Sequence, residues 1–349
     1  MQNKFCTPNG PQNVILRNDL WEGTLYVTHN NITIQTIMNE YPFRLICDEQ
    51  QESINPDILA KRPFLEVDTS FAAEAKRFIP GTRLETAINT AIAVGMPLLI
   101  TGEPGTGKTQ TAYYAAYKLG IEPVIHFQVK SDSTAKDLLY HFDTVRYFHD
   151  AHLPKPDAVL DKKNYIEKRA LWEAMESEHP RVVLIDEIDK APRDFPNDLL
   201  LELDQMAFTI TETGETITIR DKKQYPLIFI TSNSEHRLPE PFLRRCVYHH
   251  IRFDEELLKK VLEKRKDEFA QLSGGFIELA SKRFWELRRQ DCRKKPATGE
   301  FLVWLRVLIL VRETNSEEML KNKLQGNLAD LPSLGTLLKD RQDMEDLER

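Results

Sequence analysis

Short apolar runs alternate with segments of helical periodicity through the middle of the chain. The runs have the length of strands and occur at 97–101, 124–129, 182–186, 227–231 and 247–251. Between several of them, apolar residues recur every three or four positions, as in the helix predicted around Leu84 to Ile92. Buried strands that alternate with helices predict a mainly parallel sheet covered on both faces, and so an α/β core over residues 73–253. A hairpin predicted at 208–219, with Thr213 and Gly214 at its turn, interrupts this rhythm.

The pattern changes on both sides of the core. Residues 1–72 predict a small β-containing extension, because residues alternate around 29–31 as in a hairpin and a further strand is favoured at 41–47. Beyond residue 254 no strand signal remains, and helices are predicted at 255–269, 275–289, 298–313 and 316–324. Residues 254–349 therefore predict a helical domain that ends in a tail.

The charge balance of the chain is acidic. It carries 54 Asp and Glu residues against 47 Lys and Arg residues, a formal net charge of -7. A nucleic-acid-binding protein more often shows a basic excess or a basic face. The one basic cluster, at 288–295, is better interpreted as a solvated helix face, so we expect no nucleic-acid partner.

Two further observations bear on the compartment. No apolar run approaches the roughly 18 residues that span a bilayer, and the polar N-terminus lacks the apolar stretch of a signal peptide. The cysteines are too far apart in sequence to suggest a metal knuckle or a redox pair, and stand at Cys6, Cys47, Cys246 and Cys292. The sequence predicts a cytoplasmic protein with no membrane partner.

The motif with the clearest chemistry follows the first buried strand. It matches Gly-x-x-x-x-Gly-Lys-Thr and reads Gly102-Glu103-Pro104-Gly105-Thr106-Gly107-Lys108-Thr109. Glycines let backbone N–H groups curl around phosphate oxygens, and the helix that follows turns its positive end toward the anion. Lys108 would reach the β- and γ-phosphates, and the Thr109 hydroxyl would be a ligand of Mg²⁺. The loop therefore predicts binding of ATP with Mg²⁺.

Two carboxylates stand at the end of the third buried strand. Asp186 and Glu187 follow the run Val182 to Ile185, at the edge where open parallel sheets bind ligands. Alone, such a pair is more often a strand-to-loop turn. After a phosphate loop, we interpret Asp186 as part of the Mg²⁺ shell and Glu187 as the residue that activates the attacking water.

Three polar residues after the next strand are candidates for the same site. Asn233 ends that strand and would contact the γ-phosphate or the water, a turn or capping asparagine being an equally good interpretation. Arg244 and Arg245 follow and would stabilise charge on a phosphate. Their ordinary alternative is a surface ion pair.

The order of these motifs resembles that of the AAA+ ATPases, and more narrowly that of the MoxR family in the helix-2-insert clade. The likeness spans roughly residues 73–312 and rests on four blocks: the loop at 102–109, Gln-Val-Lys-Ser-Asp at 128–132, Ile-Asp-Glu-Ile-Asp-Lys-Ala at 185–191, and Leu-Pro-Glu-Pro-Phe-Leu-Arg-Arg-Cys at 238–246. Residues 1–70 match nothing known in that group, which leaves partner and pathway open.

The resemblance implies roles for individual residues. Asn233 matches the sensor of the γ-phosphate. Arg245, with Arg244 as the alternative, matches the finger that serves the ATP of a neighbouring subunit. The segment between Lys136 and Ile166 fits the helix-2 insertion, and the hairpin at 208–219 fits the one before the sensor strand.

A lid arginine is implied as well. Arg306 stands among apolar helical neighbours, where an unpaired charge is costly. ATP phosphate is one partner for it, and Glu313 or a core ion pair is the alternative.

The activity implied by the resemblance is hydrolysis of ATP by a homo-oligomer, commonly a hexameric ring, that remodels or chaperones a protein client. Such ATPases often work with a protein that bears a von Willebrand factor A domain. A nucleic-acid motor or restriction subunit is one alternative, which the acidic charge disfavours. A slow nucleotide-gated switch in a defence system is another. No Asn-Lys-x-Asp follows the phosphate loop, which favours ATP over GTP.

Overall fold

The computed structural model describes residues 27–28, 31–32, 70–152, 160–219, 221–233 and 236–348. The chain divides into two compact units. The α/β unit comprises residues 63–270 and 295–302, and the helical unit comprises residues 1–62, 271–294 and 303–349. No helix in the described part of the chain is both long and apolar enough to cross a membrane.

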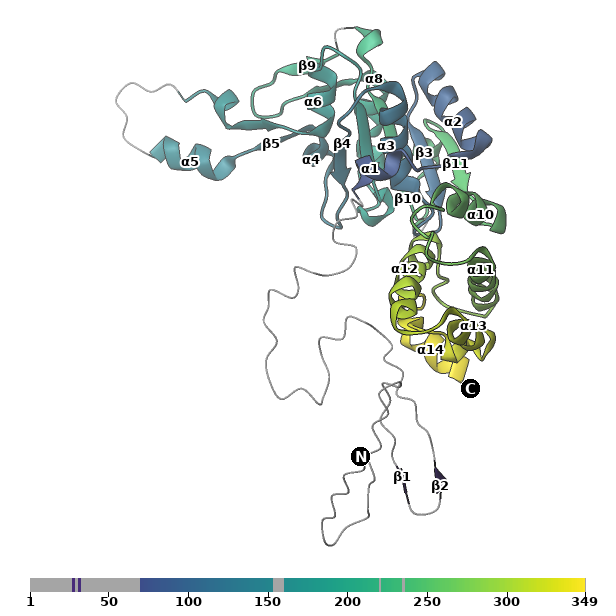
Figure 1. The fold of residues 1–349 in the computed structure, drawn as a ribbon. Helices are drawn as coiled ribbons and strands as arrows, with labels where there is room; N and C mark the ends of the chain where they lie inside the picture. Colours follow the sequence, from purple (N-terminus) through teal and green to yellow (C-terminus); the bar gives the residue numbers. More distant parts are fainter. Residues whose placement is uncertain are drawn as a thin grey trace, which may run out of the picture. The chain divides into compact units, whose positions relative to one another are not determined.

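A five-stranded sheet forms the centre of the α/β unit (Figure 1). In spatial order its strands are β11 (Val247–Ile251), β3 (Leu98–Gly102), β10 (Leu227–Ser232), β7 (Val182–Asp186) and β4 (Ile125–Gln128). All four neighbouring pairs are parallel. The predicted parallel sheet is confirmed, and its carboxyl ends meet at one edge because every strand runs the same way.

Helices cover both faces of the sheet, because side chains alternate between the faces along each strand. On one face Leu98, Ile100 and Leu184 pack with residues of α2 (Gly81–Val94) and α3 (Lys108–Leu119). The other face packs with four shorter helices, α4 (Ala135–Leu139), α6 (Ala170–Glu176), α7 (Phe195–Asp198) and α8 (Leu200–Gln205). This two-sided burial explains why the strands read as unbroken apolar runs rather than as alternating ones.

Two hairpin-like insertions leave this core. The first pairs β5 (Tyr140–Phe142) with β6 (Ile166–Lys168) in antiparallel fashion. It carries α5 (Thr144–His152) away from the sheet (Figure 1) and a 3₁₀ turn at Lys162–Tyr165. The second pairs β8 (Ala207–Thr209) with β9 (Thr216–Thr218), so the hairpin predicted at 208–219 is confirmed.

Glu212 joins the two insertions. Its carboxylate accepts a hydrogen bond of 2.5 Å from Lys136 Nζ on one oxygen and one of 2.8 Å from the Tyr140 hydroxyl on the other. Lys162 Nζ donates to its carbonyl oxygen at 3.0 Å. We call this contact the Glu212 clamp. It ties the turn of the second insertion to α4, to the start of β5 and to the 3₁₀ turn before β6.

The boundary between the units lies beyond α10 (Glu255–Lys264), whereas the sequence pattern places it at 253/254. Arg265, just after α10, makes ion pairs with Glu74 and Glu268, and its side chain is only 10% exposed. Glu74 lies on α1 (Phe71–Ala75), so α10 is tied to the start of the described α/β unit. Helical periodicity alone does not reveal this attachment.

The helical unit is built from α11 (Gly274–Arg288), α12 (Thr298–Thr314), α13 (Glu317–Gln325) and α14 (Arg341–Glu348), with short 3₁₀ turns at Leu328–Asp330 and Leu334–Thr336. Residues 298–302 of α12 group with the α/β unit. The sequence pattern predicts only a tail where α14 forms. Asp343 of α14 is buried and accepts hydrogen bonds from the amides of Arg293 and Lys294.

Two further expectations can be compared with the structure. The basic cluster at 288–295 is mostly exposed, but Arg288 is 8% exposed and lies over the ring of Trp285, so it is not part of a solvated face. In the N-terminal extension, β1 (Val27–Thr28) pairs antiparallel with β2 (Asn31–Ile32), as the hairpin prediction requires. The strand predicted at 41–47 lies outside the described residues.

Candidate active site

The loop between β3 and α3 has a backbone that only glycine allows at two points. Gly107 adopts φ 88°, in the left-handed region, and a Cβ there would lie 2.8 Å from Cε2 of Phe78. A Cβ on Gly102 would lie 2.8 Å from the carbonyl oxygen of Ile251. No side chain caps the start of α3. The loop thus presents backbone and the positive end of a helix, the arrangement that binds phosphate.

Lys108 begins α3 and folds back over the loop. Its Nζ donates hydrogen bonds of 2.9 Å to the carbonyl oxygens of Gly102 and Glu103. Burial lowers the pKa of the Lys108 ammonium below its usual value, against the charges of Asp189, Asp186, Glu187 and Glu103, which raise it. The Lys108 ammonium is therefore held at the loop, where it can neutralise the charge of a bound phosphate.

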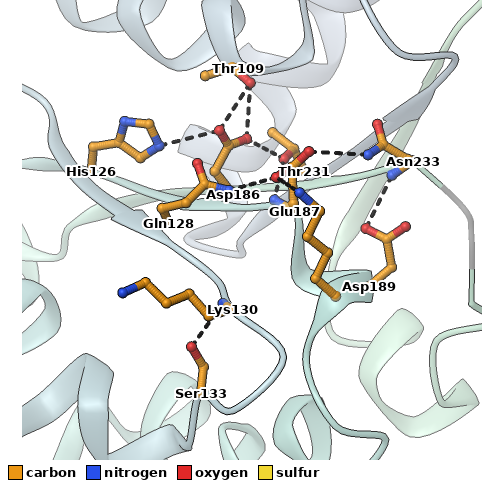
Figure 2. Close-up of polar contacts among 11 residues, drawn as sticks. Thr109, His126, Gln128, Lys130, Ser133, Asp186, Glu187, Asp189, Thr231 and Asn233 are labelled. Carbon is orange, nitrogen blue, oxygen red and sulfur yellow. Dashed lines mark hydrogen bonds and ion pairs between the residues drawn. The ribbon is translucent and has the colours of Figure 1, made fainter. Parts of the chain in front are cut away.

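Asp186 ends β7 and is buried with three hydrogen-bonding neighbours (Figure 2). Thr231 Oγ1 donates to Oδ1 at 2.5 Å, Thr109 Oγ1 lies 2.9 Å from Oδ1, and His126 Nε2 lies 3.2 Å from Oδ2. Burial alone would raise the pKa of Asp186, but hydrogen bonds from His126, Thr231 and Thr109 outweigh it and lower the pKa. The carboxylate is therefore ionised at neutral pH.

Glu187 adopts φ 60° and ψ 51°, a left-handed conformation that is uncommon for residues other than glycine. Its amide donates to Thr231 Oγ1 at 2.8 Å, so the same threonine that binds Asp186 also fixes this turn. Strained backbone of this kind persists only where its surroundings impose it, and it collects at functional sites. The turn aims the Glu187 side chain away from the strand that carries Asp186.

The carboxylate of Glu187 has three side-chain partners (Figure 2). Gln128 Nε2 donates to Oε2 at 2.7 Å, Asn233 Nδ2 donates to Oε1 at 3.3 Å, and Lys190 forms an ion pair with Oε2. The backbone amide of Asn233 donates to Asp189 Oδ1 at 3.2 Å. The structure thus brings Asn233 beside the carboxylate that the sequence interprets as the activator of water.

These residues line a cavity of about 400 Å³ within the α/β unit. Its lining includes residues 104–109, Asp186, Glu187 and Asn233. The rest of the lining is largely apolar and includes Ile79, Pro80, Leu257, Val261 and Leu302. A nucleotide requires polar groups for its phosphates and apolar surface for its base, and the lining offers both; the volume lies in the range of small-ligand sites.

The oxygen donors of this lining fit Mg²⁺. The Thr109 hydroxyl donates its hydrogen to Asp186, which leaves its lone pairs for a cation. Asp186 is ionised, and Mg²⁺ prefers one or two carboxylates together with phosphate oxygens. Among the described residues no group of three or more His, Cys, Asp or Glu side chains is arranged to hold a metal without a ligand's help.

The two candidate finger arginines are exposed and pair within their own chain. Arg245 Nε donates to Asp204 Oδ2 at 2.5 Å, and Arg244 forms an ion pair with Glu240 one turn earlier on α9 (Glu240–Leu243). Neither arginine is among the described residues that line the cavity. Arg306 is half-buried on α12 in the helical unit.

Four residues at the site escape the sequence interpretation: His126, Gln128, Lys190 and Thr231. His126 and Gln128 lie two apart on β4, so both side chains reach the same face. Thr231 stands two before Asn233 on β10. Each is a polar residue in or just after a strand whose carboxyl end lies at the site. The sequence shows this polarity, but its importance becomes clear only once the order of the strands in the sheet is known.

Part of the α/β unit is similar to a known protein family. Residues 97–246 match the family model described as AAA domain (dynein-related subfamily). A crystal structure of a candidate ATPase from Cytophaga hutchinsonii is similar at 14% identity and a TM-score of 0.36, over 79% of this chain and 83% of that one. No curated protein matches the sequence significantly.

Proposed function

From an AAA domain at residues 97–246, we propose that this chain is a Mg²⁺-dependent ATPase. The observation that carries the proposal is the pair of adjacent carboxylates held in different directions at the phosphate loop. Asp186 is bound by Thr109 of the loop, and Glu187 is turned out of the strand by its left-handed backbone. One carboxylate then serves the metal and the other the water.

The side chains divide the work of hydrolysis. Lys108 moves from the carbonyls of the loop to the β- and γ-phosphate oxygens, which offer it full negative charge. Mg²⁺, held by Thr109 and Asp186, would supply neutralisation of phosphate charge when bound. Glu187 accepts a proton from the attacking water, and Asn233 beside it orients that water or the γ-phosphate.

We further propose that the ATPase is of the MoxR type and acts as a ring on a protein client. The support is the Arg244–Arg245 pair after the sensor strand, which is exposed and outside the lining of its own cavity. An arginine that serves a neighbour's ATP needs a head-to-tail contact, and such contacts either close into rings or run on as open helices. The insertion with α5 and the clamped hairpin offer surfaces to a client, for which a von Willebrand factor A domain protein is the expected partner.

A slow nucleotide-gated switch is the second candidate, and one observation favours it. The carboxylate of Glu187 is engaged by both Gln128 and Lys190, and these contacts must be released before it can meet an attacking water. In this version binding of ATP changes the conformation, and turnover serves only to reset it.

One set of steady-state assays tests both. We expect Mg²⁺-dependent release of phosphate from ATP, more slowly from GTP, with no stimulation by DNA at about 0.15 M salt. EDTA should abolish it, and Glu187→Gln should abolish it while nucleotide still binds. Turnover on the order of 1 s⁻¹ supports a remodelling enzyme, since that is the lower end of ordinary enzyme rates. Turnover slower by 10²-fold or more supports the switch, and binding without any turnover contradicts the ATPase proposal.

A further inference from the structure

A chain of three side chains leads from α3 to the magnesium-binding carboxylate. The Tyr113 hydroxyl lies 3.0 Å from His126 Nδ1, and His126 Nε2 lies 3.2 Å from Asp186 Oδ2. Tyr113 lies on α3 and His126 on β4, the edge strand next to β7. The imidazole of His126 therefore bridges Tyr113, on the helix that follows the phosphate loop, and Oδ2 of Asp186.

Hydrogen bonding fixes the tautomer of this histidine. His126 Nε2 lies 3.2 Å from Asp186 Oδ2, and a carboxylate oxygen accepts, so Nε2 carries the hydrogen of this bond. In the neutral ring Nδ1 is then an acceptor and receives a hydrogen bond from the Tyr113 hydroxyl. Burial and the charge of Asp186 raise the pKa of Tyr113, so the phenol stays a donor.

The Asp186 carboxylate is thereby held at both oxygens. Thr231 binds Oδ1 and His126 binds Oδ2, which prevents rotation about the last side-chain bond. The remaining lone pairs are directed to Thr109, the other predicted Mg²⁺ ligand (Figure 2). Neighbours that orient a metal ligand in this way change metal affinity without touching the ion.

Tyr113 is itself held in place from the other side. Phe71 of α1 stacks on its ring with centroids 5.0 Å apart and an interplanar angle of 16°. Gln110 Nε2 donates to the carbonyl oxygen of Phe71 at 2.7 Å, which ties α1 to α3. The stack fixes the plane of the Tyr113 ring, with the hydroxyl within hydrogen-bonding distance of His126.

We propose that His126 is a positioning residue for the magnesium ligand Asp186, with Tyr113 setting its tautomer. The proposal rests on the proposed ATPase function, because it concerns the metal of that same site. It predicts a defect in binding of the metal–nucleotide complex rather than of nucleotide alone.

The test is calorimetric binding of a non-hydrolysable ATP analogue to the full chain, once in EDTA and once in saturating Mg²⁺. The ratio of the two Kd values is the metal-linked gain. We expect His126→Ala to lower this gain about 10- to 100-fold, the usual effect of losing a neighbour of a metal ligand. The Kd in EDTA should stay within about twofold of wild type, since the loop is untouched.

Three variants separate positioning from folding. His126→Gln keeps an N–H donor near the position of Nε2 and should restore much of the gain. Tyr113→Phe keeps the stack on Phe71, loses only the hydroxyl, and should lower the gain a few-fold. His141→Ala removes an exposed histidine of β5 and should change nothing.

Each outcome has one meaning. A full metal-linked gain in His126→Ala overturns the proposal, and so does an equal loss of affinity in EDTA and in Mg²⁺, which indicates a merely structural role. If wild type binds no nucleotide, or shows no metal-linked gain, the proposed ATPase function fails instead. If His126→Ala and Tyr113→Phe lose the gain while His126→Gln and His141→Ala keep most of it, the positioning role stands.

Discussion

Gln128 donates a hydrogen bond of 2.7 Å to Glu187 Oε2, across the boundary between the edge strand β4 and the end of β7. Two residues earlier on the same face of β4, His126 binds Asp186. One short strand thus supplies a separate partner to each of the two adjacent carboxylates. Because side chains alternate on a strand, this assignment is set by strand register alone. It ties the position of the two acids to the placement of β4.

Lys108→Ala and Glu187→Gln should fail in different ways. The first removes the cation that meets the phosphates, so we expect nucleotide affinity to fall by at least 10-fold. The second keeps the shape and the hydrogen bond from Gln128 but not the base, so turnover should fall about 10²- to 10⁴-fold with little change in Kd. Binding and phosphate release measured side by side check this. Equal affinities in the two variants, or full turnover in Glu187→Gln, would contradict the division of labour.

Gly107→Ala should damage the loop more than Gly120→Ala, its matched control at the other end of α3. Both glycines are left-handed, at φ 88° and φ 68°, so each alanine costs on the order of 1–2 kcal/mol of stability. Only at Gly107 does a new Cβ also meet a neighbour, Phe78 at 2.8 Å, whereas nothing lies within 4 Å at Gly120. We therefore expect only Gly107→Ala to lose ATP affinity. Similar thermal unfolding with similar ATP binding in both variants would refute this reading of the loop.

Arg245→Ala should bind ATP normally and hydrolyse it poorly, with a fall of about 10³-fold if the arginine stabilises the developing phosphate charge. Mixing it with Lys108→Ala subunits should restore part of the activity, because one variant offers an intact pocket and the other an intact arginine. Arg244→Ala is the comparison, since Arg244 pairs only with Glu240 among the contacts described for its helix. Absence of rescue in a proven mixed assembly would leave Arg245 as the surface partner of Asp204.

Cys246 should resist alkylation in the folded protein. Burial, with the charge of Asp204 in the same sense, raises the pKa of its thiol to about 12. The thiolate is the reactive form, so at pH 8 only a fraction on the order of 10⁻⁴ is available. Reactivity should appear as pH rises toward that value, or at once in urea. Mass spectrometry of the peptide after iodoacetamide treatment measures it, and rapid native labelling at pH 8 would show that the thiol is not held as described.

The sheet is predictable from the sequence because its strands are buried on both faces. The runs at 182–186 and 247–251 have the same bounds as β7 and β11. Elements that depend on a few tertiary contacts are not predictable in this way. α14 has a polar sequence, and its attachment comes from Asp343 accepting two backbone N–H groups of a loop. No periodicity reports such a contact.

The residues of the candidate site also differ in whether the sequence alone predicts them. Lys108, Thr109, Asp186, Glu187 and Asn233 stand in motifs whose spacing is fixed by chemistry, and the structure brings them together at one cavity. The residues that hydrogen-bond to the two carboxylates are determined by the register between neighbouring strands. Gln128 lies opposite Asp186 in the ladder between β4 and β7, and His126 lies opposite Leu184. A sequence contains no direct record of which residue faces which across two strands, nor of the left-handed turn at Glu187.

The Glu212 clamp has a mechanical consequence. Burial would raise the pKa of Glu212, but the hydrogen bonds from Lys136 and Tyr140 prevail and lower it, so the clamp keeps its charge through the neutral range and opens only as acid protonates the carboxylate. We therefore expect a force on α5 and a force on the β8–β9 turn to be transmitted through the same residue, Glu212. The ion pair of Lys163 with Glu215, at 2.7 Å, adds a second link, so we expect the two insertions to move as one body.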